Sequence, residues 1–498
     1  MKDDVRRRHH LILSLFVVVG AVTTEPTVAL AQVAEPPAPV DPAPPTAPTS
    51  PSPATPPVSA PAPPAPPPTP TPPPTPAPPP TPAPSSEAAP HTAELPALAP
   101  PDPATVPDAM PSDDGDATIE WPRPVQIHGF VSEGAFLSTA NDYIGKSSRG
   151  SVAMFEAGLN MSTEVADRLR VGLQLYGRDV GRFRDLPPRL DWAYLDYRWR
   201  PWLGIRAGVI KMPFGLYNEY ADVDASRVAI LTPQSVYPLR NRSALLAHTG
   251  LGLYGNKSIG SAGQLEYQAW FGTLNVPENA LTVGGASLDE IDTKYVTGAQ
   301  AFWLTPLEGL RIGATYLRTS IDFKLTLDPA VTQALIMMGL VPADYDGKVV
   351  VSQRPVWLWL ASAEYSYRDW LFAAEYGRVR QRQSTSLPDL LPTTKLESEV
   401  FYAMVTHRFC PLVEAGGYYS VAHADVHDRQ GRDATRFPQR VFAFQRDLAA
   451  TLRFDVNDHW LWKVEGHFID GASDLEAADN PMPKRYWGLF LVKTTVTF

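Results

Sequence analysis

From residue 125 onward, the chain is a series of short segments in which apolar and polar residues alternate. In one of them, Leu169, Val171 and Leu173 share one side of an extended strand, while Arg170 and Gln174 share the other. This period of two is the period of a β-strand, whose successive side chains point to opposite faces. The same alternation recurs at 203–210, 265–271, 310–316 and 459–468. The pattern predicts an all-β fold for this part of the chain.

The connections between these segments are alternately short and long. Short polar connections fall at 165–168, 200–202, 305–309, 367–370, 408–411 and 455–458, and long ones at 213–247, 274–293, 321–352, 379–396, 422–442 and 470–484. A soluble sandwich also alternates, so the alternation by itself does not decide between the two. Short turns on one side and long loops on the other are typical of an outer-membrane barrel. We therefore predict a transmembrane antiparallel β-barrel over 125–498.

The barrel is expected to contain about 16 strands. Their predicted starts lie near Gln126, Ser151, Arg168, Arg189, Leu203, His248, Gly263, Lys294, Gly309, Pro355, Trp370, Glu397, Leu412, Phe444, His459 and Arg485. With an even number of strands, both ends of the chain lie on the periplasmic side. A barrel of this size leaves a water-filled lumen, whereas eight strands would be packed shut.

The first 31 residues have the features of a secretory signal peptide. Basic residues at 6–8 precede an apolar run at 11–22, and Ala29 and Ala31 have the spacing of a signal-peptidase site. The run is too short to cross a bilayer as a helix. We therefore expect residues 1–31 to direct export, and strands to make any membrane crossing.

Residues 32–124 are predicted to form a disordered periplasmic linker rich in proline, alanine and threonine. Most of the 54 prolines of the chain lie here. Proline lacks an amide donor and fixes φ, so polyproline II is the expected state. Such a segment is either a plain spacer or a tether to peptidoglycan, and its composition names no ligand.

The end of the chain is predicted to close the barrel. Phe490, Val496 and Phe498 belong to the apolar side of a final strand. This strand must pair with the first one, because an open edge in hydrocarbon leaves backbone groups without hydrogen bonds. A final phenylalanine preceded by alternating apolar residues resembles the assembly signal of Gram-negative outer-membrane proteins, which implies the barrel assembly machinery as a partner.

The long connection at 213–247 is the third external loop, and the alternation also places charged residues on the lumen wall. A loop with charges of both signs, folded into the lumen, would favour small hydrated solutes. The candidate constriction residues are Lys211, Glu219, Asp222, Asp224, Arg227, Arg240 and Arg242. The candidate wall residues are Arg170, Arg198, Arg206, Arg311, Arg453, Glu266 and Glu465. A salt-bridged lining with weak selectivity and an arginine ladder for anions are both compatible with this set.

The segment 189–238 and the terminal KTTVTF resemble the outer-membrane porin superfamily that includes the phosphate-selective porins O and P, together with related proteobacterial porins. The likeness covers 125–498, and its most specific element is the G-x-x-K-x-P-F-G stretch at 208–215. It implies a homotrimeric, solute-conducting barrel of 16 or 18 strands. The third loop lacks the run of arginines expected of a phosphate-specific member.

Other functional classes fit less well. No G-x-S-x-G elbow is present, so we predict no enzyme, and no cofactor is expected. The H-A-D-V-H-D stretch at 423–428 lies in a predicted loop, where a solvated segment is favoured over a metal site. The net charge of -10 argues against nucleic acid. We predict an outer-membrane porin that passes small hydrophilic solutes or ions and contacts outer-membrane lipid. The alternative is a structural protein that tethers the outer membrane to the cell wall.

Overall fold

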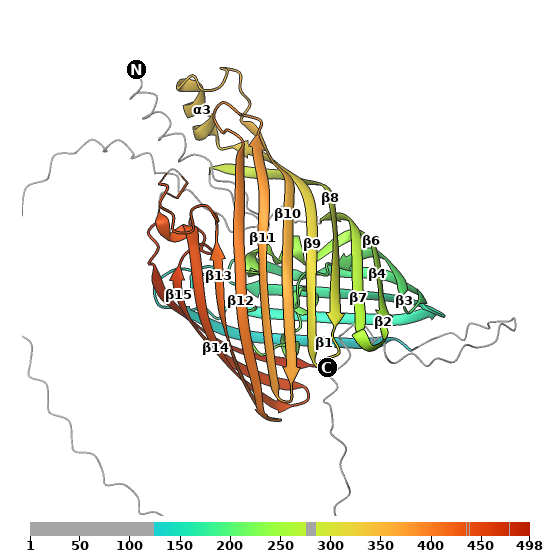
Figure 1. The fold of residues 1–498 in the computed structure, drawn as a ribbon. Coiled ribbons are helices and arrows are strands. Elements are labelled where there is room, and N and C mark those ends of the chain that lie inside the picture. The colour runs from blue at the N-terminus through green and yellow to red at the C-terminus, as the bar shows by residue number, and fades with distance from the viewer. Residues whose placement is uncertain (1–123, 275–284, 435, 438, 478) are drawn as a thin grey trace, which may run out of the picture. The chain divides into compact units, whose positions relative to one another are not determined.

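The computed structural model describes residues 124–274, 285–434, 436–437, 439–477 and 479–498. The predicted signal peptide at 1–31 and the predicted linker at 32–124, except for its last residue, lie outside these residues. In the described residues, sixteen strands form one closed antiparallel barrel, in which neighbours in sequence pair and β1 also pairs with β16 (Figure 1). The predicted all-β barrel is confirmed. Among the helices in the described ranges, none has the length and apolar character needed to span a membrane.

The strands are long, and the helical pieces within the described residues are short. The strands are β1 Gln126–Ser138, β2 Met154–Ala166, β3 Leu169–Val180, β4 Phe183–Arg200, β5 Leu203–Lys211, β6 Ala247–Ser258, β7 Gln264–Leu274, β8 Ala286–Leu304, β9 Leu310–Leu327, β10 Lys348–Tyr367, β11 Trp370–Thr385, β12 Thr394–Cys410, β13 Val413–His423, β14 Phe444–Asn457, β15 Trp460–Gly471 and β16 Tyr486–Thr497. The α-helices are α2 Arg242–Leu245 and α3 Pro329–Met337, and the 3-10 helices are η2 Asn218–Tyr220, η3 Asp224–Ser226, η4 Leu239–Asn241, η5 Gly260–Ala262 and η7 Arg440–Ala443.

The outer surface of the barrel is apolar. Large hydrophobic side chains that point outward, such as Leu251, Phe271 and Leu448, are more than half exposed. Soluble proteins rarely leave so much contiguous apolar surface in water. A closed sheet with this surface satisfies its backbone internally and meets lipid with its side chains, which are the two requirements of a membrane barrel.

Aromatic side chains gather at the end of the barrel that carries the short turns. The exposed ones there are Trp199, Trp202, Trp303, Tyr367, Trp370, Trp460 and Trp462. Trp199 and Trp202 lie together across the turn between β4 and β5, with ring centroids 5.5 Å apart. Tryptophan and tyrosine prefer the boundary between hydrocarbon and water. We call this ring the lower aromatic belt.

The seam of the barrel joins its first and last strands. Val131 pairs with Val496, and the backbone groups of Gly129 and Phe498 exchange hydrogen bonds of 2.9 and 3.0 Å. The Phe498 ring covers Gly129 so closely that a Cβ there would lie 2.3 Å from it. Glycine at position 129 therefore lets the final aromatic residue lie flat on the first strand. Phe490, Val496 and Phe498 are all exposed on the outer face.

Three strands begin six to eight residues earlier than the sequence predicts. β4 begins at Phe183 rather than near Arg189, β8 at Ala286 rather than near Lys294, and β10 at Lys348 rather than near Pro355. The reason is visible in β9. Its apolar residues face outward up to Tyr316 and inward from Leu317 onward. Above Tyr316 the strand no longer faces lipid, so its apolar residues point to the interior. In the sequence, this change of side resembles the end of a strand.

The upper part of the interior is apolar, which the expectation of a wet lumen missed. Leu317, Ile321, Phe323, Val356 and Leu358 point inward and belong to one buried cluster. These residues belong to β9 and β10, two long strands that rise above the rest of the wall and are joined through α3 (Figure 1). A second buried cluster lies between the β15–β16 wall and the loops near β1. Only part of the interior is therefore lined by polar groups.

Candidate functional site

The connection between β5 and β6, residues 212–246, is the third external loop and is called L3 here. Its ends are joined by a hydrogen bond of 2.8 Å from the Met212 amide to the Leu246 carbonyl. Between them, most of its residues are buried. They contact inward-facing side chains of strands on several sides of the barrel. L3 therefore lies inside the lumen.

The first arm of L3 is held by a carboxylate on β11. Glu375 accepts hydrogen bonds from the Leu216 amide at 3.0 Å, from Tyr402 on β12 at 2.8 Å and from Ser362 on β10 at 2.5 Å. The Tyr237 hydroxyl, from the returning arm of L3, donates to the same carboxylate. Glu375 is 1% exposed. One buried acceptor thus joins both arms of the loop to the wall.

The middle of L3 is held by two lysines on the opposite wall. Asp224 lies 3.1 Å from Lys463 on β15 and 3.4 Å from Lys493 on β16, and accepts a hydrogen bond of 2.9 Å from Thr495. Lys463 also donates to the Asp224 carbonyl at 2.6 Å. The lysines lie directly opposite each other in the strand register. Like charges placed so close repel, and Asp224 offsets that repulsion.

A second wall carboxylate, Glu465 on β15, binds the next part of the loop. Glu465 accepts hydrogen bonds from the amides of Ile230 and Leu231 at 2.7 and 2.9 Å. His467 lies 3.0 Å from Glu465 through Nε2 and 3.0 Å from Asp447 through Nδ1. Glu465 therefore acts as an anchor for the loop backbone and presents no free charge to the lumen.

Two arginines in this region bind backbone carbonyls. Arg227 donates to the Ile230 carbonyl at 2.5 Å and lies 3.7 Å from Asp224. Arg453, on β14, donates to the Ala225 carbonyl at 2.7 Å. Both guanidinium groups therefore fix the fold of L3 against the wall, in addition to contributing positive charge.

The returning arm of L3 carries an ion-pair chain to β4. Arg242 lies 2.7 Å from Asp222 and 2.9 Å from Asp191, and its guanidinium is 4.0 Å from the Tyr176 ring centre. Burial by itself would lower the pKa of Arg242. The ion pairs with Asp191 and Asp222 outweigh this effect, so the pKa of Arg242 is raised well above its usual value.

Arg240 points toward a different part of the structure. It lies 3.2 Å from Asp474, which belongs to the loop between β15 and β16. The Tyr143 hydroxyl donates to the same carboxylate at 2.9 Å. Arg240 therefore faces the external loops. It does not lie beside Asp191 and Asp222, the partners of Arg242.

At the base of L3, Lys211 and Glu219 come together with β7. Lys211 donates to the Glu219 carbonyl at 2.8 Å and lies 3.4 Å from Asp222. Gln268 donates to the Glu219 carboxylate at 3.3 Å. Burial raises the pKa of Glu219 above its usual value, although Arg206, Gln268 and Lys211 oppose the shift. Glu219 therefore takes up a proton at a higher pH than an exposed glutamate does.

The two aspartates of L3 behave in the opposite way. Burial alone would raise the pKa of Asp222, but Arg242 and Lys211 outweigh it and hold the pKa well below its usual value. The same holds for Asp224, whose pKa is lowered by Lys463 and Lys493 against the effect of burial. Both carboxylates therefore keep their charge far into acid.

Lowering the pH from about 7 to about 5 is expected to move the ion preference toward anions while L3 stays attached. Glu219 loses its charge before Asp222 and Asp224 do, because its pKa is raised while theirs are lowered. The stability that Asp222 and Asp224 contribute is present above the usual aspartate pKa, and it is lost only as the pH falls through their lowered values. Reversal potentials in planar bilayers measure the shift. Glu219→Gln should remove it, and an equal shift in that variant would contradict the assignment.

The predicted wall residues lie on the inner face, several of them in ion pairs. Arg206 lies 2.9 Å from Asp196, and its guanidinium is 4.3 Å from the Tyr254 ring centre. Arg311 lies 2.8 Å from Glu364. These pairs correspond to the salt-bridged lining considered from the sequence. They do not form a continuous ladder of free arginines.

Arg170 and Arg198 contact neutral side chains. Arg170 donates to Gln126 at 2.9 Å and to Ser162 at 2.7 Å. The guanidinium of Arg198 lies 5.7 Å from the Tyr254 ring centre. Glu266 is on the same part of the wall, on β7 next to β6. The wall from β3 to β7 thus carries its polar groups below L3.

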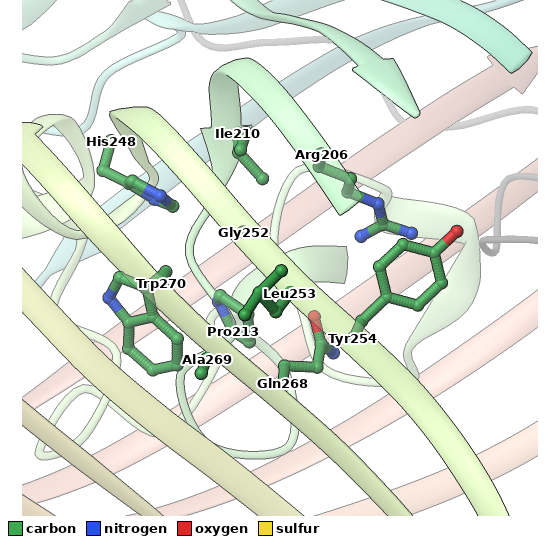
Figure 2. A pocket seen from close by; sticks show the side chains of 10 residues that line it. All are labelled: Arg206, Ile210, Pro213, His248, Gly252, Leu253, Tyr254, Gln268, Ala269 and Trp270. Carbon is green, nitrogen blue, oxygen red and sulfur yellow. The ribbon is translucent and has the colours of Figure 1, made fainter. Parts of the chain in front are cut away.

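A small hollow lies at the base of L3, between β5, β6 and β7 (Figure 2). Its empty space is about 220 Å³, part of which is open to solvent. Its lining residues are Arg206, Ile210, Pro213, His248, Gly252, Leu253, Tyr254, Gln268, Ala269 and Trp270. Trp270 Nε1 has no hydrogen-bond partner among the described residues. The hollow therefore offers an unused hydrogen-bond donor in a lining that also contains Arg206.

Sequence reasoning missed several of the residues that hold L3 to the wall. Lys463, Lys493, Glu375 and Asp191 were not among the predicted site residues, although each contacts the loop. The sequence does indicate a role for the two lysines. The loop between β15 and β16 is too long to reveal that they lie opposite each other, but two lysines that point inward from neighbouring strands require a nearby anion.

Comparisons with known proteins add a likeness of fold. No family model matches the sequence, and no curated protein matches it. Similar solved structures include OmpF of Salmonella typhi in complex with daunomycin (TM-score 0.47, 11% identity, 76% of this chain and 98% of that chain). Others are the anion-selective porin from Comamonas acidovorans (0.46, 10%, 76% and 100%) and the outer membrane channel DcaP of Acinetobacter baumannii (0.44, 14%, 75% and 97%). At these values the likeness carries no argument about solute, and the fold rests on the strand register.

Proposed function

We propose that the protein is an outer-membrane porin through which small hydrophilic solutes or ions diffuse passively, with L3 as the constriction. The observation that carries the proposal is a closed barrel, apolar outside, whose third external loop lies in the lumen with charges of both signs. Paired charges in a narrow passage favour hydrated solutes over apolar ones. Neither covalent chemistry nor a cofactor is part of this function.

The route for solutes is proposed to follow the wall from β2 to β7. On the opposite side, Leu216, Leu358 and Leu360 pack between L3 and the strands β10 and β11, and this apolar packing excludes water. On the β2–β7 side, Arg170 and Arg198 remain half-exposed. Hydrated solutes would therefore pass between the polar side of L3 and these strands.

Replacing Arg240 and Arg242 by alanine is expected to shift the reversal potential toward cations. The double variant removes two positive charges and leaves the carboxylates of Asp191, Asp222 and Asp474 without their arginine partners. Negative charge beside the route attracts cations. Single-channel conductance and the reversal potential under a salt gradient in planar bilayers measure the effect, and conduction itself tests the proposed function.

The matched control is Arg432→Ala. Arg432 is exposed in the loop between β13 and β14 and contacts Gln430 at 2.8 Å. Its removal should leave the reversal potential unchanged. A barrel that conducts no ions would overturn the proposed function, and equal shifts in the control and the double variant would remove L3 from the route.

The predicted partners extend this proposal. A homotrimer, contact with outer-membrane lipid and insertion by the barrel assembly machinery are consistent with the closed apolar barrel. The likeness to the phosphate-selective porins O and P remains a prediction from the sequence. Binding of peptidoglycan by the proline-rich linker falls outside the described residues, as does the tethering function considered as the alternative.

A further inference from the structure

The outer face of β9, β10 and β11 carries arginines around one tryptophan. Trp357 on β10 lies opposite Arg318 on β9 and opposite Arg380 on β11 in the strand register. All three side chains are exposed. The guanidinium of Arg318 lies 5.8 Å from the centre of the Trp357 ring. Neighbouring strands are about 4.8 Å apart, so two cations flank one indole within about 10 Å.

The height of this group in the membrane follows from the length of β10. Tyr367, at the other end of the strand, belongs to the lower aromatic belt. Trp357 is ten residues away from it, and a strand that rises about 3.3 Å per residue at a tilt of about 40° climbs about 25 Å over that length. The apolar band of an outer-membrane barrel has this height. The outward positions between them are Trp359, Ala361, Ala363 and Tyr365. Arg318 and Arg380 therefore lie at the level of lipid headgroups.

This face has more positive than negative charge. Glu397 on β12 is shared by Arg378 at 3.1 Å and Arg380 at 3.0 Å. Within the described part of the chain, Arg318 and Arg382 form no ion pair. Other ion pairs near this level join Asp322 to Arg354 and Lys294, Lys324 to Glu290, and Glu399 to both Arg378 and Arg429. The exposed guanidinium group of Arg318 is thus available to an anion from the membrane, and Arg380 shares its carboxylate partner Glu397 with Arg378.

We propose that Arg318, Trp357 and Arg380 bind the phosphate of a lipid headgroup in the leaflet nearest the long loops. A guanidinium group matches phosphate in shape and binds it through two parallel hydrogen bonds. Trp357 sits where an indole prefers the headgroup region. The acyl chains of such a lipid would lie on the apolar residues below. This site serves the membrane surface and is independent of conduction through the lumen.

The test uses the purified full-length protein in a nonionic detergent. Phosphatidic acid, whose headgroup is a phosphate monoester, is titrated in, and bound lipid is counted by native mass spectrometry. The double variant Arg318→Gln and Arg380→Gln is expected to bind phosphatidic acid at least about tenfold more weakly. Diacylglycerol with the same acyl chains, which lacks the phosphate, should bind equally to both proteins. Heat-modifiable migration on a gel checks that the variant is folded.

The control variant is Arg368→Gln, at the opposite end of β10. The guanidinium of Arg368 lies 5.1 Å from the Tyr367 ring centre, so it also pairs an arginine with an exposed aromatic residue. Its affinity for phosphatidic acid should stay at the wild-type value. Equal binding by wild type and double variant would overturn the proposal. Inorganic phosphate that displaces the lipid at equal concentration would also overturn it, by showing a site for a free anion.

Discussion

Replacing Asp224 by asparagine is expected to release the middle of L3 and to raise the single-channel conductance. Asp224 is the carboxylate between Lys463 and Lys493, and all three groups are almost completely buried. Removing one partner of a buried ion pair costs about 3 kcal/mol or more, because the remaining charge is left uncompensated. Here both lysines lose that partner at once, although Lys493 keeps its ion pair with Glu156 at 2.5 Å. Detachment from the β15–β16 wall would free the middle of L3 to move within the lumen, and a mobile loop obstructs solutes less than a fixed one.

Release of the loop can be measured separately from conduction. Ala229 is 7% exposed in L3, so a cysteine placed there should react slowly with a small thiol reagent in the wild-type background. The native Cys410 is exposed and is first replaced by serine. Asp224→Asn should speed labelling at position 229 and increase conductance together. Asp344→Asn, in the loop between β9 and β10, removes an exposed carboxylate as the control. Unchanged labelling in Asp224→Asn would show that the ion pairs do not hold the loop.

The strands were predictable from the sequence wherever a tight turn at the level of the lower aromatic belt precedes them. Predicted starts near Leu203 and Trp370 coincide with the observed ones, and a start near Arg168 is one residue from Leu169. In such hairpins, a slip of one residue would turn every lipid-facing side chain into the lumen. The alternation of apolar and polar residues therefore fixes both the strand and its sides.

The same rule fails where the surroundings of a strand change along its length. In β9, Tyr316 faces lipid, while Ile321 and Phe323 face the interior, above the level where polar residues line the wall. The pattern then reads as a loop, although the backbone continues as a strand. Two prolines at 187–188 had the same effect in β4, because proline usually marks the end of a strand.

The charges of L3 were predictable, but their partners were not. Asp222 and Asp224 stand two residues apart, yet Asp222 binds Arg242 within the loop and Asp224 binds Lys463 on a distant strand. The direction of each side chain depends on the path of the loop through the lumen. That path is set by contacts with several walls, including the Glu375 anchor, which no local pattern of L3 contains.

Replacing Glu375 by alanine is expected to lower the stability of the barrel by about 4 kcal/mol and to change conductance little. The substitution leaves the Tyr237, Tyr402 and Ser362 hydroxyls without their acceptor in a buried place, while the Leu216 amide loses one of two acceptors and keeps the Tyr237 oxygen at 2.7 Å. Each unsatisfied buried donor costs about 1–3 kcal/mol, and the hydroxyls recover part of this by bonding to one another. The temperature at which the folded band on a gel converts to the unfolded band measures the loss.

The small effect on conductance follows from the apolar packing around this anchor. Leu216, Leu360 and Tyr402 remain in contact after Glu375 is gone, so water is still excluded between L3 and the β10–β11 wall. Glu375→Gln is the matched control. Its amide oxygen can still accept from the Leu216 amide while its NH₂ group donates to the tyrosine oxygens, so the loss should be about 1 kcal/mol. A large rise in conductance in Glu375→Ala, equal to that of Asp224→Asn, would mean that solutes pass on this side of the loop and that the proposed route along β2–β7 is wrong.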